Sequence, residues 1–317
     1  MQNQIAVVGG CNIDISATSY TFLIEADSNP GYVKTTLGGV GRNIAENLLL
    51  LGYPVSMITP LSRDSFLSQI LSHSVEIGLD LSHSVYFDDV PNSVYLCINH
   101  PNGDIALAVS CMEICEKLTP DVISTQMDFL NSCPYVVLDA NLRADTLAYI
   151  AEHCHSALCA DAVSVKKAER LRPILHRLTF LKVNRAEAEI LVGFPVNDFD
   201  SVSKASALLH AQGIPIVAIT MGSGGAFLSN GDEACVLPPM AHDGVNYSGC
   251  GDAFFAGVLH GLINRKSTSA TLRCGLAMSA LSASSPSAPT MTVSVMLTPN
   301  EIKLWNAAGS AIRSSDL

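Results

Sequence analysis

Short apolar runs and longer amphipathic stretches alternate along most of the chain. Runs that are typical of buried strands lie at 5–8, 54–59, 135–138, 157–160, 179–183 and 216–220. Apolar residues with helical spacing lie at 44–51, 65–77, 121–130, 143–153, 185–192, 201–211, 268–283 and 299–307. Strands that alternate with helices indicate a mainly parallel sheet with helices on both of its faces.

Two regions depart from this rhythm. Residues 14–37 and 84–110 contain short apolar runs separated by turn residues, without a helical stretch inside them. This pattern is typical of antiparallel strands. We therefore predict a second, small β-sheet built from approximately 14–37 and 84–110. We find no internal repeat and expect a single α/β domain over residues 1–310 that includes this sheet.

Composition and charge narrow the class of partner. Of the 317 residues, 48% are hydrophobic and 15% are charged, which provides material for a large core. The net charge of −11 argues against nucleic acid or an anionic membrane as the main partner, because both are negatively charged. A site for an anionic nucleotide would need local compensation, from backbone N–H groups or from a metal ion.

No segment predicts export or membrane insertion. Residues 1–4 lack the basic and apolar regions of a secretory signal, and no run approaches the roughly 20 apolar residues of a membrane helix. The ten cysteines are scattered, so we interpret them as free thiols of a cytoplasmic protein. A metal site from His153, Cys154, His155 and Cys159 is disfavoured, because paired cysteine spacing is missing.

Residues 246–253 carry the strongest chemical signal. Gly249 and Gly251 flank Cys250, Asp252 follows, and an apolar helix continues from Phe254. A glycine turn that enters a helix presents free backbone N–H groups at the positive end of the helix dipole, which suits a phosphate. A carboxylate beside a phosphate is useful if it takes a proton from an attacking hydroxyl, so Asp252 is a candidate general base. The alternative is a tight turn with an aspartate that caps a core helix.

Three further sites lie at strand ends or in glycine turns. Asn12 and Asp14 follow the first strand, where a carboxylate can accept O–H bonds from the vicinal diol of a sugar. Residues 38–43 open a helix, and residues 220–225 follow a strand. Taken singly, each of the three could be an ordinary turn. The candidates in the two glycine turns are Gly38, Gly39, Val40, Gly41, Arg42 and Asn43, and then Thr220, Gly222, Gly224 and Gly225.

The order of the motifs is more specific than any one of them. The chain reads N-I-D at 12–14, G-G-V-G-R-N at 38–43, N-x-x-E at 184–187, T-M-G-x-x-G at 220–225 and G-C-G-D at 249–252. This order resembles the PfkB/ribokinase family of sugar and nucleoside kinases, over about residues 4–300. The resemblance implies a ribokinase-like three-layer α/β sandwich in which the small sheet is a lid over the sugar. It also implies ATP and Mg²⁺ as cofactors.

The resemblance assigns a role to each motif. Asn12, Asp14 and residues 38–43 would bind the sugar hydroxyls, and Asn141 lies where the family often touches substrate. Asn184 and Glu187 would organise Mg²⁺ and the triphosphate, Glu187 acting indirectly through water. Residues 220–225 would line the nucleotide. Gly249, Cys250 and Gly251 would form an anion hole, and Asp252 would be the base.

Two positions depart from the family pattern. Cys250 replaces the usual alanine, which should be tolerated because the anion hole uses backbone N–H groups. Asn246 replaces a common aspartate, which speaks against activation by a monovalent cation such as K⁺. The acceptor stays open between a nucleoside, ribose and a ketohexose. A nucleotide-binding regulator without turnover is the alternative from another class. An exposed lid sheet could also pair with a second protomer to form a homodimer.

Overall fold

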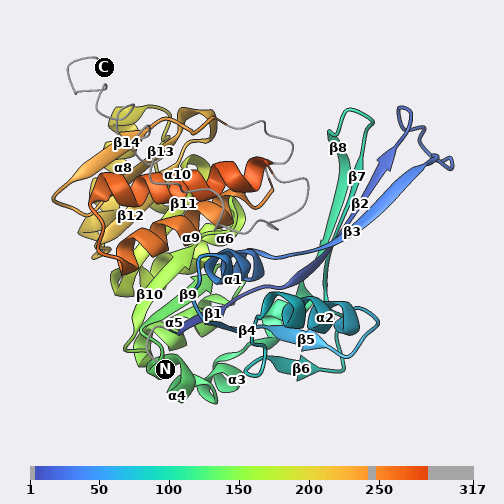
Figure 1. Cartoon of the computed structure of the whole chain (residues 1–317), viewed down its shortest axis with the longest axis horizontal. Coiled ribbons are helices and arrows are strands. Elements are labelled where there is room, and N and C mark those ends of the chain that lie inside the picture. The colour runs from blue at the N-terminus through green and yellow to red at the C-terminus, as the bar shows by residue number, and fades with distance from the viewer. Residues whose placement is uncertain (1–3, 242–247, 285–317) are drawn as a thin grey trace.

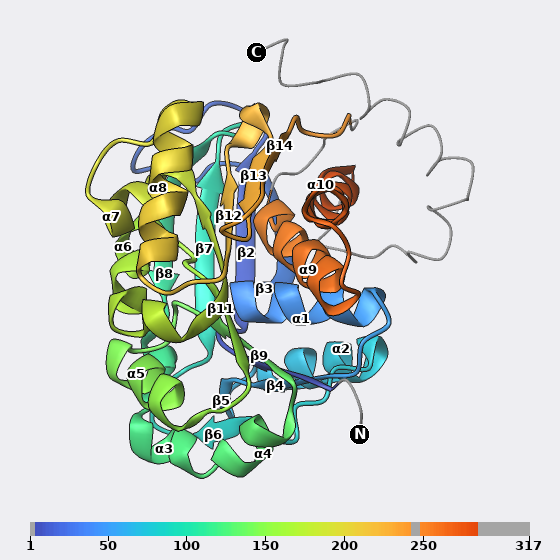
Figure 2. The ribbon, with the colours of Figure 1, turned by 90° about the vertical axis from the view of Figure 1, so that its left-hand side faces the viewer.

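The computed structural model describes residues 4–241 and 248–284 of the chain. A large sheet forms the centre, and a separate small sheet projects from it (Figure 1). Figure 2 shows the large sheet between two layers of helices. The predicted α/β sandwich with a mainly parallel sheet is confirmed. The helix predicted at 299–307 lies outside the described residues.

The large sheet has eight strands. Their order is β14 (Ala234–Leu237), β13 (Ala226–Ser229), β12 (Ile216–Thr220), β11 (Leu178–Asn184), β10 (Ala157–Asp161), β9 (Tyr135–Asp139), β1 (Ile5–Val8) and β4 (Val55–Ile58). The strands from β12 to β4 run parallel. At one edge β13 pairs antiparallel with β12, and β14 pairs antiparallel with β13. Burial on both faces explains why β1 is a continuous apolar run.

Helices cover the two faces of this sheet with separate cores. One face carries α1 (Val40–Leu50), α2 (Leu67–Ile77), α9 (Cys250–Ile263) and α10 (Thr268–Ser284). The other carries α3 (Pro120–Ser124), α4 (Met127–Ser132), α5 (Ala144–His153), α6 (Val165–Ala168), α7 (Arg185–Val192) and α8 (Phe199–Ala211). Short 3₁₀ helices lie at η1 (Glu113–Lys117), η2 (Glu169–Arg177) and η3 (Gly222–Gly224). The single helix predicted at 121–130 is divided, because the Ser124 and Thr125 hydroxyls bond back to preceding carbonyls where α3 ends.

The small sheet, which we call the arm, has four strands. Their order is β3 (Gly31–Gly38), β2 (Asn12–Ser19), β7 (Ser93–Asn99) and β8 (Ile105–Cys111). Strand β2 follows β1 after three residues, and β3 leads directly into α1. The base of the arm is therefore attached beside the carboxyl end of β1.

The prediction that residues 85–87 belong to the small sheet is wrong. Strand β6 (Val85–Phe87) pairs with β5 (Pro60–Ser62) in a separate parallel pair and does not join the arm. The reason lies in Asn92, whose side chain accepts from the N–H of Ser62 and donates to its carbonyl, at 2.9 Å each. These bonds tie the segment after β6 to β5. Strand β7 then enters the arm parallel to β2, so residues 84–110 do not form a simple meander.

The two faces of the arm differ in chemistry. Residues directly opposite one another in a sheet share a face, so the register defines each row. One face is apolar except for Thr35, and its rows are Leu37–Ile13–Val94–Cys111, Thr35–Ile15–Leu96–Val109 and Val33–Ala17–Ile98–Leu107. The opposite face is mainly polar and carries Asn12 and Asp14 near the base of the arm. The predicted sugar-binding residues therefore lie on the polar face.

Candidate active site

A row of polar residues crosses the carboxyl end of the central sheet. The apolar residues on the face covered by α1 and α9 include Val137, Cys159, Phe180 and Ala218 of β9 to β12. Two residues further along, the same face carries polar side chains, because side chains alternate along a strand. Asp139, Asp161 and Lys182 are direct neighbours across β9, β10 and β11. The N-termini of α1 and α9 meet this row.

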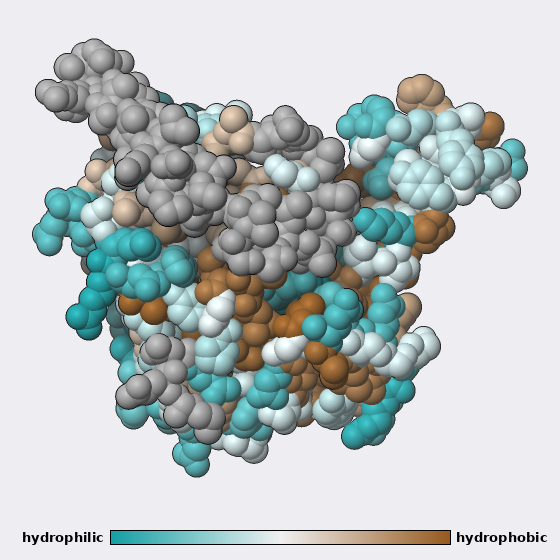
Figure 3. Space-filling view, viewed as in Figure 1, coloured by the Kyte–Doolittle hydropathy of each residue, from teal (hydrophilic) through white to brown (hydrophobic). Residues whose placement is uncertain are grey.

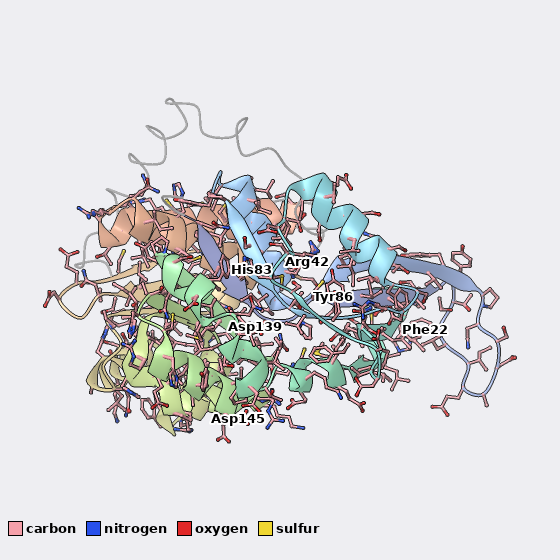
Figure 4. All side chains as sticks on the ribbon, turned by 90° about the horizontal axis from the view of Figure 1, so that it is seen from below. Phe22, Arg42, His83, Tyr86, Asp139 and Asp145 are labelled. Atoms are coloured by element: carbon pink, nitrogen blue, oxygen red, sulfur yellow. The ribbon has the colours of Figure 1, made fainter. Side chains whose placement is uncertain are left out.

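Asp139 completes the N-terminus of α1. This side chain is 0% exposed, and Figure 4 shows it in the interior of the molecule. Its Oδ2 accepts from Gly10 N at 2.9 Å, from Gly41 N at 2.8 Å and from Asn141 Nδ2 at 2.9 Å. Burial raises the pKa of Asp139, and these hydrogen bonds oppose the rise. A Cβ at Gly9 would lie 2.5 Å from Oδ2, so the carboxylate requires glycine there.

Asp252 lies in the first turn of α9. Its side chain is buried, with 8% exposed, and Asn43 of α1 donates from Nδ2 to its Oδ2 at 2.8 Å. Burial and the nearby Asp161 carboxylate raise the pKa of Asp252 to about 7, although Lys182 and Asn43 lower it. A carboxyl group with such a pKa can gain or lose a proton near neutral pH, as a general base must. The cap residue Gly249 has φ 79°, which favours glycine.

Lys182 and Asp161 form an ion pair inside the site. Lys182 Nζ lies 3.0 Å from Asp161 Oδ2, and the two side chains are 7% and 1% exposed. Burial opposes the charge on Lys182, but Asp161, Glu187 and Asp252 outweigh it and raise the pKa of the lysine. The ammonium also lies 3.0 Å from where a Cβ of Gly251 would be. Sequence reasoning assigned no role to Asp139, Asp161 or Lys182. The available signal was a charged residue at the end of each apolar run.

Asp14 and Asn12, the predicted sugar-binding residues, lie on β2 at the base of the arm. A Cβ at Gly38 would lie 2.0 Å from Asp14 Oδ2, so the carboxylate lies over this glycine. Burial raises the pKa of Asp14 to about 6, while Arg42 lowers it. Asn12 Oδ1 and Asn43 Oδ1 are buried acceptors without a hydrogen-bond partner among the described residues. Buried acceptors of this kind suit the hydroxyl donors of a ligand.

The glycine turn at 38–43 forms the start of α1. Gly39 is its cap, with φ 96°, and a Cβ there would lie 2.4 Å from Gly10 O. The helix begins at Val40, four residues earlier than predicted, so Val40, Gly41, Arg42 and Asn43 form its first turn. The Arg42 guanidinium is paired with Glu46 and donates to Leu37 O at 2.8 Å, so it joins α1 to the arm. Its contact with substrate stays a prediction.

Asn184 and Glu187 cap α7. Asn184 Oδ1 accepts from Glu187 N at 2.9 Å, and Glu187 Oε2 accepts from Asn184 N at 2.8 Å. Burial raises the pKa of Glu187, while Lys182 lowers it. The carboxylate and amide oxygens at this edge are of the type that Mg²⁺ prefers, and Mg²⁺ usually keeps several waters. The oxygen atoms of Asn184 and Glu187 therefore suit a magnesium ion that is held partly through water.

The predicted nucleotide turn follows the next strand. Thr220 is the register partner of Asn184, so the two motifs lie side by side. Gly222 and Gly224 belong to η3, and Gly222 has φ 58°. Gly225 has φ 85°, and a Cβ there would lie 2.0 Å from Leu237 O. This backbone conformation and close contact account for the glycine at 225.

Three other predicted residues have distinct outcomes. Asn141 is buried, and Lys167 Nζ donates to its Oδ1, so both ends of its amide have partners in the protein. Cys250 begins α9, and burial raises the pKa of its thiol. Asn246 lies outside the described residues. Within residues 4–241 and 248–284, no three His, Cys, Asp or Glu residues form a metal cluster. Among the helices described, none could cross a membrane.

Comparisons with known proteins identify the family and the fold of the chain. The model of the pfkB family carbohydrate kinases matches residues 2–294. The chain belongs to this family. It is 30% identical over 259 residues to pseudouridine kinase of Escherichia coli, which covers 81% of this chain and 83% of that protein. It is 26% identical over 287 residues to guanosine-inosine kinase of Exiguobacterium acetylicum, at 88% and 93% coverage.

The fold has solved counterparts. A structure of Arabidopsis thaliana ribokinase complexed with ribose and ATP has a TM-score of 0.81 and covers 92% of this chain and 96% of that chain, at 20% identity. This likeness shows that the chain has the ribokinase fold. As a member of the pfkB family of carbohydrate kinases, the protein is a phosphotransferase with an alcohol group as acceptor.

Proposed function

We propose that the protein transfers the γ-phosphoryl group of ATP to the 5′-hydroxyl of pseudouridine, which yields ADP and pseudouridine 5′-phosphate. The observation that carries phosphoryl transfer is Asp252, a buried carboxyl group with a pKa raised to about 7 in the first turn of α9. The similarity to a pseudouridine kinase supports the choice of acceptor.

The chain's own residues supply the proton transfer and the positioning. Asp252, held by Asn43, takes the proton of the 5′-hydroxyl as its oxygen attacks the γ-phosphorus in line and the bond to ADP breaks. Asn12 and Asp14 bind the ribose hydroxyls from the arm. Gly249, Cys250 and Gly251 offer backbone N–H groups to the phosphoryl oxygens.

The remaining partners are small. Mg²⁺, organised through water by Glu187 and Asn184, neutralises charge on the triphosphate when it is bound. We expect equal activity in K⁺ and in Na⁺, because residue 246 is asparagine. The proposed reaction takes place in the cytoplasm, where ATP is available and thiols remain reduced, as suits the buried free thiols of Cys11, Cys154 and Cys159. Nucleic acid and membranes are not partners in this proposal.

A panel of acceptors tests the substrate. Purified protein with MgATP is given pseudouridine, uridine, inosine, guanosine, ribose or fructose, and coupled ADP release is measured at several concentrations of each. We expect the highest kcat/KM for pseudouridine. A higher kcat/KM for inosine or guanosine would show that the acceptor is a purine nucleoside. A higher kcat/KM for ribose or fructose would show that the acceptor is a free sugar. Nucleotide binding without ADP release on any acceptor would replace the kinase with a regulator.

The arm is proposed to act as a lid and as a dimer interface. Closure of its polar face over the sugar would exclude water, which otherwise competes as phosphoryl acceptor. Its other face is apolar, and its outer residues are open to solvent, with Val33 68% and Leu107 58% exposed. Figure 3 shows the arm standing apart from the body of the molecule. An apolar surface of this kind marks an interaction site, and its lack of charge suits a second copy of the same face.

Adjacent residues of β8 give a matched test of the dimer. Leu107 lies on the apolar face and Ala108 on the opposite one. We expect a dimer by light scattering for the wild type and for Ala108→Glu, and a monomer for Leu107→Glu. A monomeric wild type, or a Leu107→Glu variant that remains dimeric, would contradict this interface.

A further inference from the structure

The ammonium group of Lys182 lies at the N-terminus of α9, where the helix dipole is unfavourable for a positive charge. Lys182 Nζ lies 3.0 Å from the Cβ position of Gly251, the second residue of α9. The N-terminus of a helix carries partial positive charge, which repels cations and attracts anions. A buried ammonium at this point must therefore be stabilised by negative charge.

The negative charge inside the protein comes from carboxylates. Asp161 pairs with Lys182 at 3.0 Å, and Glu187 and Asp252 act on the lysine from α7 and α9. The same lysine is held on β11, a strand in the middle of the central sheet, so its position is fixed by the fold. A fixed charge in a buried site acts more strongly than one in water and needs no reorganisation during the reaction.

We infer that Lys182, anchored by Asp161, is a positioning residue of phosphoryl transfer that sets the charge behind the anion hole at Gly251. The inference rests on the proposed kinase reaction and extends it to residues outside its motifs. Lys182 acts through α9 and Asp252. It places positive charge where the transferring phosphoryl group becomes more negative, and it keeps Asp252 from holding its proton too tightly.

The competing explanation is purely structural, since a buried ion pair is expensive to break. Removing one partner leaves an unpaired buried charge, which destabilises the fold whatever the pair does in catalysis. Replacing both partners by neutral residues removes that cost. The double variant Asp161→Asn with Lys182→Met therefore separates charge balance from catalysis.

The central experiment measures kcat and thermal stability for Lys182→Met and for the double variant. We expect kcat to fall at least about tenfold in both, while Tm drops in the single variant and recovers in the double. A surface control, Lys204→Met, changes a lysine that lies over the ring of Phe194 on the other helical layer and should keep the wild-type kcat. Recovery of kcat to within threefold of the wild type in the double variant would overturn the inference.

The pH dependence gives a readout that a structural role would not move. Asp252 is faced by Asn43 of α1, Asp139 of β9, Asp161 of β10 and Lys182 of β11, with Cys250 on its own helix. Loss of Lys182 removes a charge that lowers the pKa of Asp252, so the acid limb of kcat should move to higher pH. Loss of Asp161 alone, in Asp161→Asn, removes a charge that raises it, so the limb should move to lower pH. If the acid limb moved in the same direction in Lys182→Met and in Asp161→Asn, the result would contradict the inference.

A binding measurement keeps the test independent of the acceptor. Calorimetry gives the ratio of the dissociation constants for MgADP and MgATP in the wild type and in Lys182→Met. We expect this ratio to fall about tenfold in the variant, because the γ-phosphate loses the positive charge behind Gly251. If the wild type turns over no acceptor, the kinase proposal fails while this ratio still tests Lys182. An unchanged ratio would remove Lys182 from the anion hole.

Discussion

Helices α1 and α9 begin at the same edge of the central sheet, yet their N-termini face opposite charges. At α1, the Asp139 carboxylate accepts from Gly41 N at 2.8 Å and takes the place that an anion would occupy. At α9, the Lys182 ammonium lies beside Gly251. Helix N-termini favour anions. The N-terminus of α1 already has the Asp139 carboxylate as its anion, whereas the N-terminus of α9 suits an anion supplied by a ligand. The comparison indicates which of the two glycine-rich helix starts receives the phosphate.

The largest effect is expected at α9. Asp252→Asn keeps the shape of the side chain but removes the base, so kcat should fall at least about 10²-fold while ATP binding stays near normal. Coupled ADP release and calorimetry measure the two quantities. Asp145→Asn, at an exposed carboxylate on α5, is the control and should keep its activity. Substantial residual turnover in Asp252→Asn would exclude Asp252 as the base.

The two helix starts can be compared with one substitution each. A Cβ at Gly41 would meet Gly9 Cα at 3.0 Å and Gly10 N at 3.2 Å, which are backbone atoms. Among residues 4–241 and 248–284, a Cβ at Gly251 would meet the far end of the Lys182 side chain, at 3.0 Å, and no backbone atom outside its own helix. We expect Gly41→Ala to lower stability by about 1–3 kcal/mol and Gly251→Ala to lower kcat about tenfold with less loss of stability. Denaturant unfolding and steady-state kinetics on both variants measure these effects. A larger loss of kcat in Gly41→Ala, with a larger loss of stability in Gly251→Ala, would contradict the comparison.

Asp139 should matter chiefly for folding. Asp139→Asn replaces one carboxylate oxygen by an NH₂ group that cannot accept. At least one of the buried N–H donors of Gly10, Gly41 and Asn141 then loses its acceptor, which costs about 1–3 kcal/mol. The free energy of unfolding, measured with urea, checks this value. The exposed Asp145→Asn should change it by less than about 0.5 kcal/mol. An equal loss in both variants would show that Asp139 does not complete α1.

A smaller effect concerns how the thermal stability of the protein depends on pH. The folded pKa of Asp252, about 7, is above the ordinary value of 3.8 for an aspartate, because burial favours the neutral acid. Its stabilising contribution is therefore present below pH 3.8 and is lost as the pH rises through 7. Asp252→Asn should raise Tm at pH 8 relative to the wild type, by on the order of a few degrees, and much less at pH 5. Equal Tm changes at both pH values would contradict the raised pKa.

The sequence was most informative where one local pattern determines the structure. Buried runs such as 5–8 predicted their strands, and the glycine turns at 38–43 and 249–251 predicted that a helix follows each. The start of α1 was placed at Ile44, four residues after the observed Val40. Whether the assigned residues contact substrate stays a prediction. The pairing of β6 with β5 could not be read from periodicity, because it depends on hydrogen bonds from Asn92 to a distant strand.

The charged row was missed for a related reason. Asp139, Asp161 and Lys182 lie far apart in the chain, and each resembles a polar residue at the end of a strand. Only the parallel register brings them together. Arg42 shows the converse, since a motif position that suggested a ligand contact is paired with Glu46 and the carbonyl of Leu37. Figure 4 places Arg42 inside the molecule, whereas Phe22 lies far out on the arm.

A crystal structure with a non-hydrolysable ATP analogue, Mg²⁺ and pseudouridine tests the central claim most directly. We predict the terminal phosphate at the start of α9, within hydrogen-bond distance of Gly251 N, with the Asp252 carboxylate beside the 5′-hydroxyl. A terminal phosphate at the start of α1, or a 5′-hydroxyl remote from Asp252, would contradict the account.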